Sequence, residues 1–114
     1  MDFKHTITDK QDYTLIALKG SLIETHQADE LMHEIEDLLL LEKNKFVIDL
    51  NALEFINQTG IEILYKLLAI ARKNGGELTL YNLSEELKKK PEGKKIQEVL
   101  TVSENEFLAA ALLV

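Results

Sequence analysis

The stretch Lys45-Phe-Val-Ile-Asp-Leu50 decides the fold of this chain, because it is the clearest strand in the sequence. Its apolar residues run almost without interruption, which is typical of a central strand covered by helices on at least one face. Shortly after it, Asn57-Gln-Thr-Gly60 precedes a helix predicted from about Gly60 to Lys73. Residues at helical spacing form the apolar stripe of that helix: Ile63, Leu64, Leu67, Leu68 and Ala71.

Towards the N-terminus, two strands and a helix are predicted. Phe3–Thr8 and Tyr13–Lys19 alternate apolar and polar residues, and Gly20-Ser21 is expected to end the second strand. These strands are so close in the chain that we expect an antiparallel hairpin at one edge of the sheet. A helix with an apolar stripe is predicted from about Gln27 to Leu41, with Thr25 as its N-cap.

Towards the C-terminus, Glu77–Tyr81 is predicted as a strand after the Asn74-Gly-Gly turn. A short helix capped by Ser84 and broken at Pro91 or Gly93, a strand centred on Val99–Val102, and a helix Glu104–Leu113 capped by Ser103 are expected next. The alternation predicts an α/β fold in a single domain spanning residues 1–114. We expect a mixed sheet of four to five strands, with helices mainly on one face.

Composition excludes several classes of function. The 114 residues carry a net charge of −7 and no cysteine, which argues against nucleic-acid partners and excludes disulfides and thiolate metal sites. No signal peptide is visible, and the longest apolar run, Phe107–Val114, is far shorter than the roughly 20 residues of a membrane helix. We therefore expect a cytoplasmic protein that does not insert into membranes. No phosphate-binding glycine loop or nucleophile elbow is present, so no enzyme activity and no cofactor are expected.

The stretch Phe46–Leu64, which contains Asp49-Leu50 and Asn57-Gln-Thr-Gly60, resembles the signature of the STAS family of sulfate transporters and anti-sigma factor antagonists. Leu18-Lys-Gly-Ser-Leu22, Gly75-Gly-Glu-Leu-Thr-Leu80 and Asn82-Leu-Ser84 resemble flanking family segments. The resemblance implies a STAS-like fold and the stand-alone bacterial antagonist type. Such proteins bind an anti-sigma serine kinase. Phosphorylation of a motif hydroxyl blocks this binding, and a metal-dependent serine phosphatase reverses it.

By this resemblance, Thr59 is the candidate phosphoacceptor and the partner-binding residues are Asn57, Gln58, Thr59, Gly60, Ile61 and Glu62. Thr59 has an alternative interpretation, because Thr59-Gly-Ile-Glu62 is also a capping box. Three departures from the family pattern count against a switch. Asn57 replaces an aspartate, Gln58 replaces a small hydroxyl residue, and Glu62 replaces a small residue and would repel a phosphate.

Other candidate residues each have two interpretations. Asp49 is expected either to hydrogen-bond the loop before Thr59 or to shape a turn. An apolar partner contact and burial in the core are the alternatives for Phe55, Ile56 and Ile61. The spacing of His26, Glu30 and His33 suits one helix face, but we expect a solvated surface there and no metal site. The basic cluster is expected to be solvated or to dock an acidic partner or lipid headgroups; it comprises Lys88, Lys89, Lys90, Lys94 and Lys95.

Two functions remain open. The first is a signalling antagonist that binds an anti-sigma factor kinase, is switched at Thr59 and is a monomer when free. The second is a constitutive adaptor, similar to STAS subunits that dock a transport ATPase or another signalling complex.

Overall fold

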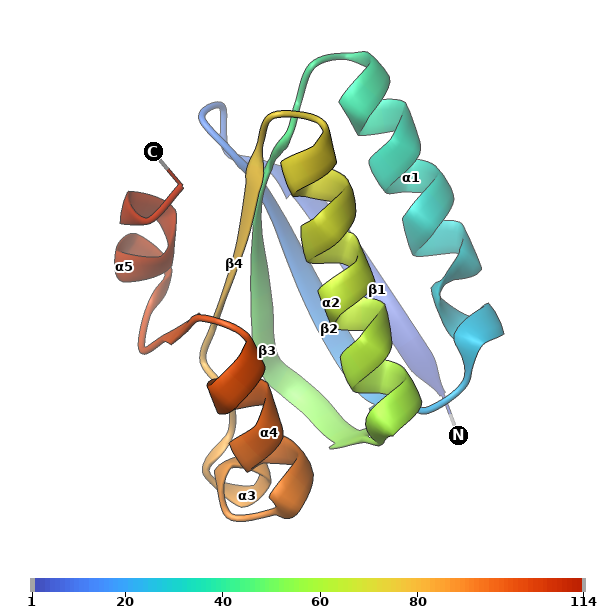
Figure 1. Ribbon diagram of the computed structural model, residues 1–114, viewed down its shortest axis with the longest axis vertical. Helices are drawn as coiled ribbons and strands as arrows, with labels where there is room; N and C mark the ends of the chain where they lie inside the picture. The colour runs from blue at the N-terminus through green and yellow to red at the C-terminus, as the bar shows by residue number, and fades with distance from the viewer. Residues whose placement is uncertain (1, 114) are drawn as a thin grey trace.

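The computed structural model describes residues 2–113 and places β3 (Lys45–Ile56) at the centre of a five-stranded sheet of order β1-β2-β3-β4-β5. This confirms the predicted mixed sheet and its central strand. β3 is longer than expected and continues past Leu50 to Ile56. Its pairing with β2 shifts register twice, so β3 carries extra residues where it bends (Figure 1). The bent end leads directly into the Asn57–Gly60 segment.

β1 (Phe3–Asp9) and β2 (Thr14–Leu22) form the predicted antiparallel edge hairpin, while the β2–β3, β3–β4 and β4–β5 pairs are parallel. The expected end of the second strand at Gly20-Ser21 is wrong, because β2 continues to Leu22. Gly20 has a φ of +94°, and a Cβ atom there would lie 2.1 Å from the Asp2 carbonyl oxygen. A glycine therefore lets the strand pass the chain start instead of ending it.

Two long helices, α1 (Asp29–Leu40) and α2 (Gln58–Lys73), lie on the same face of the sheet (Figure 1). A 3₁₀ turn, η1 (Thr25–Ala28), precedes α1, so the predicted N-cap role of Thr25 is wrong. The residue before the turn, Glu24, forms a capping box with Gln27, whose side-chain oxygen accepts from the Glu24 amide at 2.9 Å. The Glu24 side chain, which accepts from the Gln27 amide, thus performs the task that the sequence pattern assigns to the Thr25 hydroxyl.

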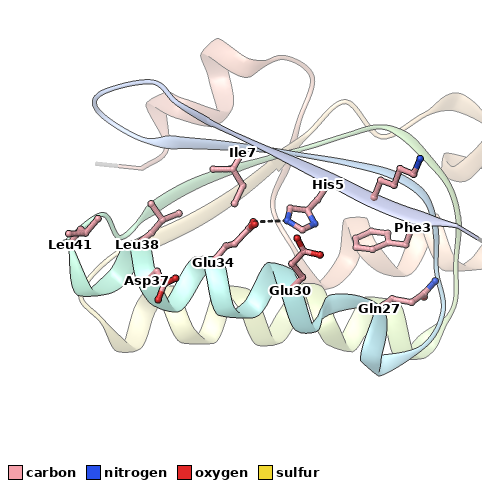
Figure 2. Close-up of a pocket in the computed structure, with 10 residues that line it drawn as sticks. Phe3, His5, Ile7, Gln27, Glu30, Glu34, Asp37, Leu38 and Leu41 are labelled. Carbon is pink, nitrogen blue, oxygen red and sulfur yellow. Dashed lines mark hydrogen bonds and ion pairs between the residues drawn. The ribbon is translucent and has the colours of Figure 1, made fainter.

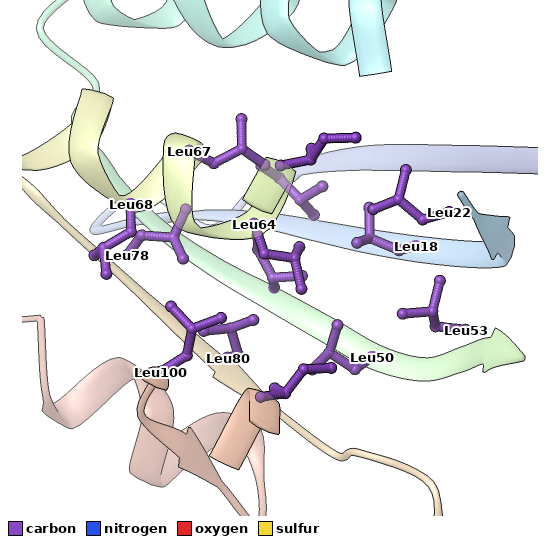
Figure 3. Close-up of a cluster of buried hydrophobic side chains, with 14 of the residues drawn as sticks. Leu18, Leu22, Leu50, Leu53, Leu64, Leu67, Leu68, Leu78, Leu80 and Leu100 are labelled. Atoms are coloured by element: carbon purple, nitrogen blue, oxygen red, sulfur yellow. The ribbon is translucent and has the colours of Figure 1, made fainter. Parts of the chain in front are cut away.

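The main core lies between this helix pair and the sheet. Leucine and isoleucine side chains from α2 and the three central strands fill it, and Phe46, Ile48 and Leu50 of β3 are fully buried. Figure 3 shows the leucines from β2, β3, β4 and α2 converging in one cluster. Such burial stabilises by about 1.5–3 kcal/mol per large aliphatic side chain. The core therefore fixes the start of α2 against the ends of β2 and β3.

The C-terminal part departs most from the predictions. β4 (Glu77–Tyr81) is confirmed, as is the short helix α3 (Glu85–Lys88), whose Ser84 cap accepts from the Leu87 amide at 3.2 Å. Pro91 begins a further helix, α4 (Pro91–Val99), because proline suits a first helical position. The strand expected around Val99–Val102 exists but lies later and is shorter, since Val99 ends α4 and β5 comprises only Val102–Ser103.

The last helix, α5 (Glu106–Ala111), lies on the opposite face of the sheet from α1 and α2 (Figure 1). Its N-cap is Asn105, which accepts from the Leu108 amide at 2.9 Å, so the predicted Ser103 cap is wrong. Buried side chains from this helix, from the residues just after it and from the sheet form a second small cluster: Val47, Tyr81, Ala109 and Leu113. The helices therefore lie mainly, but not wholly, on one face.

Candidate functional site

The candidate site is the first turn of α2, and Asn57 holds it in place. The Asn57 Oδ1 atom accepts from the Gly60 amide at 3.0 Å, which caps the helix, and Nδ2 donates to the Ile23 carbonyl at 3.0 Å. The predicted capping box starting at Thr59 is therefore wrong. Asparagine is a strong N-cap residue, and here it occupies that position two residues earlier than predicted.

Thr59 lies inside this first turn and is half-buried. Within residues 2–113, no hydrogen bond joins the Thr59 hydroxyl to another group, so the hydroxyl is available for chemistry or binding. Thr59 lines an open depression together with the first residue of α1, Asp29, and residues of the β2–α1 connection: Ile23, Glu24, Thr25 and His26. His26 is already paired with Glu24, at 3.3 Å between Nε2 and Oε2.

Gly60 brings the helix start close to the sheet. A Cβ atom at this position would lie 2.2 Å from the Leu22 carbonyl oxygen and 2.5 Å from the Ile56 side chain. Only glycine fits such an approach without moving the backbone of β2. The ends of β2 and β3 and the start of α2 are therefore packed together, which makes the site a rigid corner of the fold.

Apart from the half-buried Thr59, the predicted partner-binding residues divide into two groups. Asn57, Gln58 and Glu62 are exposed, and the Gln58 Nε2 atom lies 3.4 Å from the Glu62 Oε1 atom across one helical turn. Gly60 and Ile61 are buried, with Ile61 only 4% exposed, so they support the surface rather than form it. The exposed part has free first-turn amides, whose partial positive charge favours a negative group.

Asp49 does not reach the loop before Thr59, so that expectation is wrong. Its carboxylate accepts from the Asn51 amide at 2.9 Å, within β3. Asp49 is also paired in register with Tyr81 of β4. Burial, together with the Asp49 carboxylate, raises the pKa of Tyr81 above its ordinary value. Asp49 thus belongs to the sheet and the α5 side, not to the candidate site.

Of the apolar candidates, only Phe55 is at the surface, with 43% exposure, whereas Ile56 and Ile61 are in the core. The Lys90 ammonium lies 4.9 Å from the centre of the Phe55 ring, a cation–π distance. Lys88 pairs with Glu85 at 3.2 Å. Two members of the basic cluster therefore contact neighbouring side chains.

The structure shows no support for a metal centre in the part of the chain it describes, where no group of three or more histidine and carboxylate side chains is placed to hold an ion. His26 lies in η1 and pairs with Glu24, while His33 is an exposed residue of α1. Across residues 2–113, no helix is long and apolar enough to cross a membrane.

From the sequence, residues of the first helix were expected beside this site, but Glu24 and Asp29 were not identified individually. Glu24 and Asp29 line the depression beside Thr59, although they lie about thirty residues earlier in the chain. The expected strand topology could have indicated their position, because the carboxyl ends of the parallel strands β2 and β3 lie side by side at one end of the sheet. The connections that follow the two strands must therefore meet there.

A family model described as the STAS domain matches residues 5–107, so the chain belongs to the STAS family. Nothing among the curated proteins matches this chain.

Solved structures share the fold at low sequence identity. SpoIIAA, an anti-sigma factor antagonist, has a TM-score of 0.68 and 15% identity in its unphosphorylated form, with 96% of this chain and 94% of that chain covered. Its phosphorylated form, from Bacillus, has a TM-score of 0.65 and 14% identity, with 97% and 99% covered. An anti-sigma factor antagonist from Mycobacterium paratuberculosis has a TM-score of 0.71 and 16% identity, with 98% and 94% covered. At these identities the likeness establishes the anti-sigma-antagonist fold.

Proposed function

We propose that this protein is a cytoplasmic regulator of the anti-sigma factor antagonist type, which binds a serine-kinase anti-sigma factor through the first turn of α2. In this proposal the kinase phosphorylates Thr59, the phosphate blocks rebinding, and a metal-dependent serine phosphatase removes it. The observation that carries the proposal is the Thr59 hydroxyl, which has no hydrogen-bond partner within residues 2–113 and stands at a helix start of a STAS domain.

The geometry supports a charge-based switch. Phosphorylation would add about −1.5 to −2 charge at neutral pH. That charge would lie beside Glu24 and Asp29 in the depression, and one helical turn from Glu62. The free amides of the first turn offset part of this repulsion. The net result is an intensely negative surface, from which a partner carboxylate or an apolar contact would be excluded.

The same carboxylates favour a second candidate, the constitutive adaptor. Because His26 is already paired with Glu24, no free basic side chain lines the depression within the described part of the chain. A phosphate would lack a charged partner there. In this alternative the corner of Asn57, Gln58 and Glu62 docks an ATPase subunit or another signalling protein permanently, and Thr59 packs without being modified.

The test is partner binding combined with phosphate incorporation. Wild-type protein and Thr59→Ser, Thr59→Ala and Thr59→Glu variants are used to recover partners from the source cytoplasm, which are identified by mass spectrometry. The recovered kinase is then incubated with each variant and ATP. We expect label in the wild type and Thr59→Ser, no label in Thr59→Ala, and at least tenfold weaker partner binding by Thr59→Glu.

Thr101→Glu is the matched control, since Thr101 is an exposed threonine that precedes β5 and does not line the depression beside Thr59. This control should bind the partner as the wild type does. Recovery of an ATPase subunit with no label, and equal binding by Thr59→Glu, would overturn the switch and establish the adaptor. Loss of binding in Thr101→Glu as well as Thr59→Glu would overturn the proposed surface.

A further inference from the structure

A groove runs between β1, at the edge of the sheet, and α1. None of the residues that line it lines the depression beside Thr59, which together with the first turn of α2 is called the Thr59 corner below. The groove has a volume of about 660 Å³, and Figure 2 shows its walls, with Phe3, His5 and Ile7 from β1 facing α1. Phe3, Ile7 and Leu38 are partly buried against the core, so the floor is apolar. Leu41, at the end of α1, remains 69% exposed beside the groove.

The strand that borders this groove is an edge strand. β1 pairs with β2 alone among the strands in residues 2–113, so its outer side has free backbone amides and carbonyls. Such an edge accepts an added strand unless it is protected by charges, proline or a covering segment. Lys4 is the lysine that lines the groove, and it lies near the beginning of the strand.

The wall formed by α1 carries a row of carboxylates. Glu30, Glu34 and Asp37 line the groove at helical spacing, and Figure 2 shows Glu30 and Glu34 rising from α1 towards β1. Glu34 bonds His5, at 2.6 Å between Oε2 and Nε2, and remains 42% exposed. No ion pair neutralises Glu30 or Asp37 within the described chain.

The Glu30–Glu34 interval of this row is close to the repeat of a strand, and the Glu34–Asp37 interval is shorter, about 4.5 Å along the axis. Residues four apart on a helix are separated by about 6 Å along the axis, and alternate residues of a strand by about 6.6 Å. A strand added to β1 would therefore place every second side chain over the groove, close to one carboxylate of the row. Lysine or arginine suits these positions, because the aliphatic stem can cover the apolar floor while the charge meets the carboxylate.

From the edge strand, the groove and the carboxylate row, we propose that β1 binds an extended segment of a partner protein by strand addition, and that this segment carries basic residues at every second position. This surface is distinct from the Thr59 corner, so it gives the protein a second contact whose occupancy does not depend on phosphorylation.

The negative charge of α1 favours a basic segment over a second copy of this chain as the occupant of the groove. If two copies paired through β1, their α1 helices would approach one another. α1 carries Asp29, Glu30, Glu34, Glu36 and Asp37 and no lysine or arginine. Like charges brought together in this way oppose association. A basic segment turns the same charges into attraction.

The probe is a fluorescein-labelled, amidated peptide, Thr-Lys-Thr-Lys-Thr-Lys-Thr, titrated with the full chain and followed by anisotropy at about 50 mM salt. The pattern control is Thr-Thr-Lys-Lys-Lys-Thr-Thr, which has the same composition but places lysines on both faces of a strand. We expect the alternating peptide to bind at least fivefold more tightly, and its binding to shift the NMR resonances of β1 and α1.

Strand addition is tested with two N-methylated versions of the alternating peptide, one blocked at odd and one at even amides. Only one set of amides faces β1 in an added strand. One version should therefore lose at least tenfold in affinity, while the other keeps most of it. Equal binding by both versions would overturn strand addition.

The carboxylate row is tested by the triple variant Glu30→Gln, Glu34→Gln, Asp37→Asn. The matched control, Glu36→Gln, Glu86→Gln, Glu98→Gln, removes the same charge from exposed positions outside the groove. The first variant should bind at least tenfold more weakly and the control less than twofold. Equal weakening would show diffuse attraction and overturn the proposal, as would a dimer in sedimentation that the peptide fails to dissociate. Thr59→Ala should leave peptide binding unchanged whether or not the proposed switch is correct.

Discussion

At the start of α2, one amide side chain holds two segments of the chain together. Asn57 accepts from Gly60 through Oδ1 and donates to the Ile23 carbonyl through Nδ2. An aspartate, the residue that the family resemblance leads one to expect, would keep the first bond and lose the second. It would also place a carboxylate oxygen beside a carbonyl oxygen. The departure from the family pattern therefore has a structural use in this chain.

The first prediction compares this cap with the simpler one at Asn105. Within residues 2–113, the Asn105 side chain makes a single hydrogen bond, which it accepts from the Leu108 amide. Asn57→Asp should lower the free energy of unfolding by about 1 kcal/mol, since one bond is lost. Asn105→Asp should be neutral or slightly stabilising, because a carboxylate caps a helix and suits its positive end. Urea unfolding at neutral pH measures both. Equal effects at the two caps would contradict the bridging role of Asn57.

The second prediction concerns Gly60, where a Cβ atom would clash with backbone of β2 and the side chain of Ile56. Gly60→Ala should destabilise the fold by about 1–3 kcal/mol, because overpacking must displace one of these elements. The comparison is Gly75→Ala in the α2–β4 turn, where a φ of +77° provides strain but space is open. Thermal unfolding of both variants separates crowding from strain. If Gly60→Ala retained wild-type stability, the rigid corner described above would be wrong.

At the level of elements, α5 is attached to the sheet by polar contacts as well as by its small apolar cluster. The Tyr13 hydroxyl donates to Glu106 at 2.5 Å, and the Thr79 hydroxyl donates to the Ala109 carbonyl at 2.9 Å. The hydrogen bond to Glu106, with burial second, raises the pKa of Tyr13 from 10.0 to about 12. The neutral phenol is thus the form that the folded state favours.

The third prediction follows from the sign of that shift. A pKa raised by folding contributes stability that is present below pH 10.0 and is lost as the pH rises towards about 12. Tyr13→Phe should remove the part of this dependence that Tyr13 contributes and weaken α5 by about 1 kcal/mol, a modest value because the contact is partly exposed. Amide exchange of the α5 residues measures it. Tyr65→Phe, at a 54% exposed position, should change neither stability nor exchange; protection of α5 that is unaltered by Tyr13→Phe would contradict this account.

Elements whose pattern agrees with their burial could be predicted from the sequence. The hairpin, the central strand, α2 and β4 all follow clear periodicities, and the family resemblance identified the α2 start as the candidate site. The extension of β3 to Ile56 could not be predicted, because bulges disturb the alternation on which a strand prediction rests. α4 was missed because Pro91 reads equally as a helix breaker and as a first helical residue. The role of Asn57 depends on Ile23, a contact distant in sequence that no local pattern encodes.

At the scale of the whole molecule, charge is distributed unevenly. The chain has 20 acidic and 13 basic residues, and carboxylates concentrate on α1 and around the β2–α1 connection. Its principal extents are 36 × 29 × 21 Å. At about 0.01 M salt the Debye length is about 30 Å, so charges repel one another across the entire fold. At about 0.15 M it is about 8 Å, and only neighbouring charges interact.

The fourth prediction is that salt stabilises the fold. Raising NaCl from about 10 to about 150 mM should raise the melting temperature by about 2–5 °C, because screening relieves a self-repulsion that comes from a net charge of −7. The opposing effect is the weakening of ion pairs such as Lys43–Asp9 and Arg72–Glu77, which are 3.0 and 2.9 Å long. Both pairs are largely exposed, and exposed pairs contribute only about 0–1 kcal/mol each.

Calorimetry at several salt concentrations measures this balance, with Glu36→Lys, Glu98→Lys as the comparison. Both positions are exposed and lie outside the groove and the Thr59 corner, so the variant lowers the net charge without touching either surface. Its melting temperature should be higher than that of the wild type at low salt and should depend less on NaCl. A melting temperature that falls as NaCl is added would show that the ion pairs outweigh the repulsion. In that case the carboxylates of α1 would destabilise the folded state only slightly, and their effect would be on binding rather than on stability.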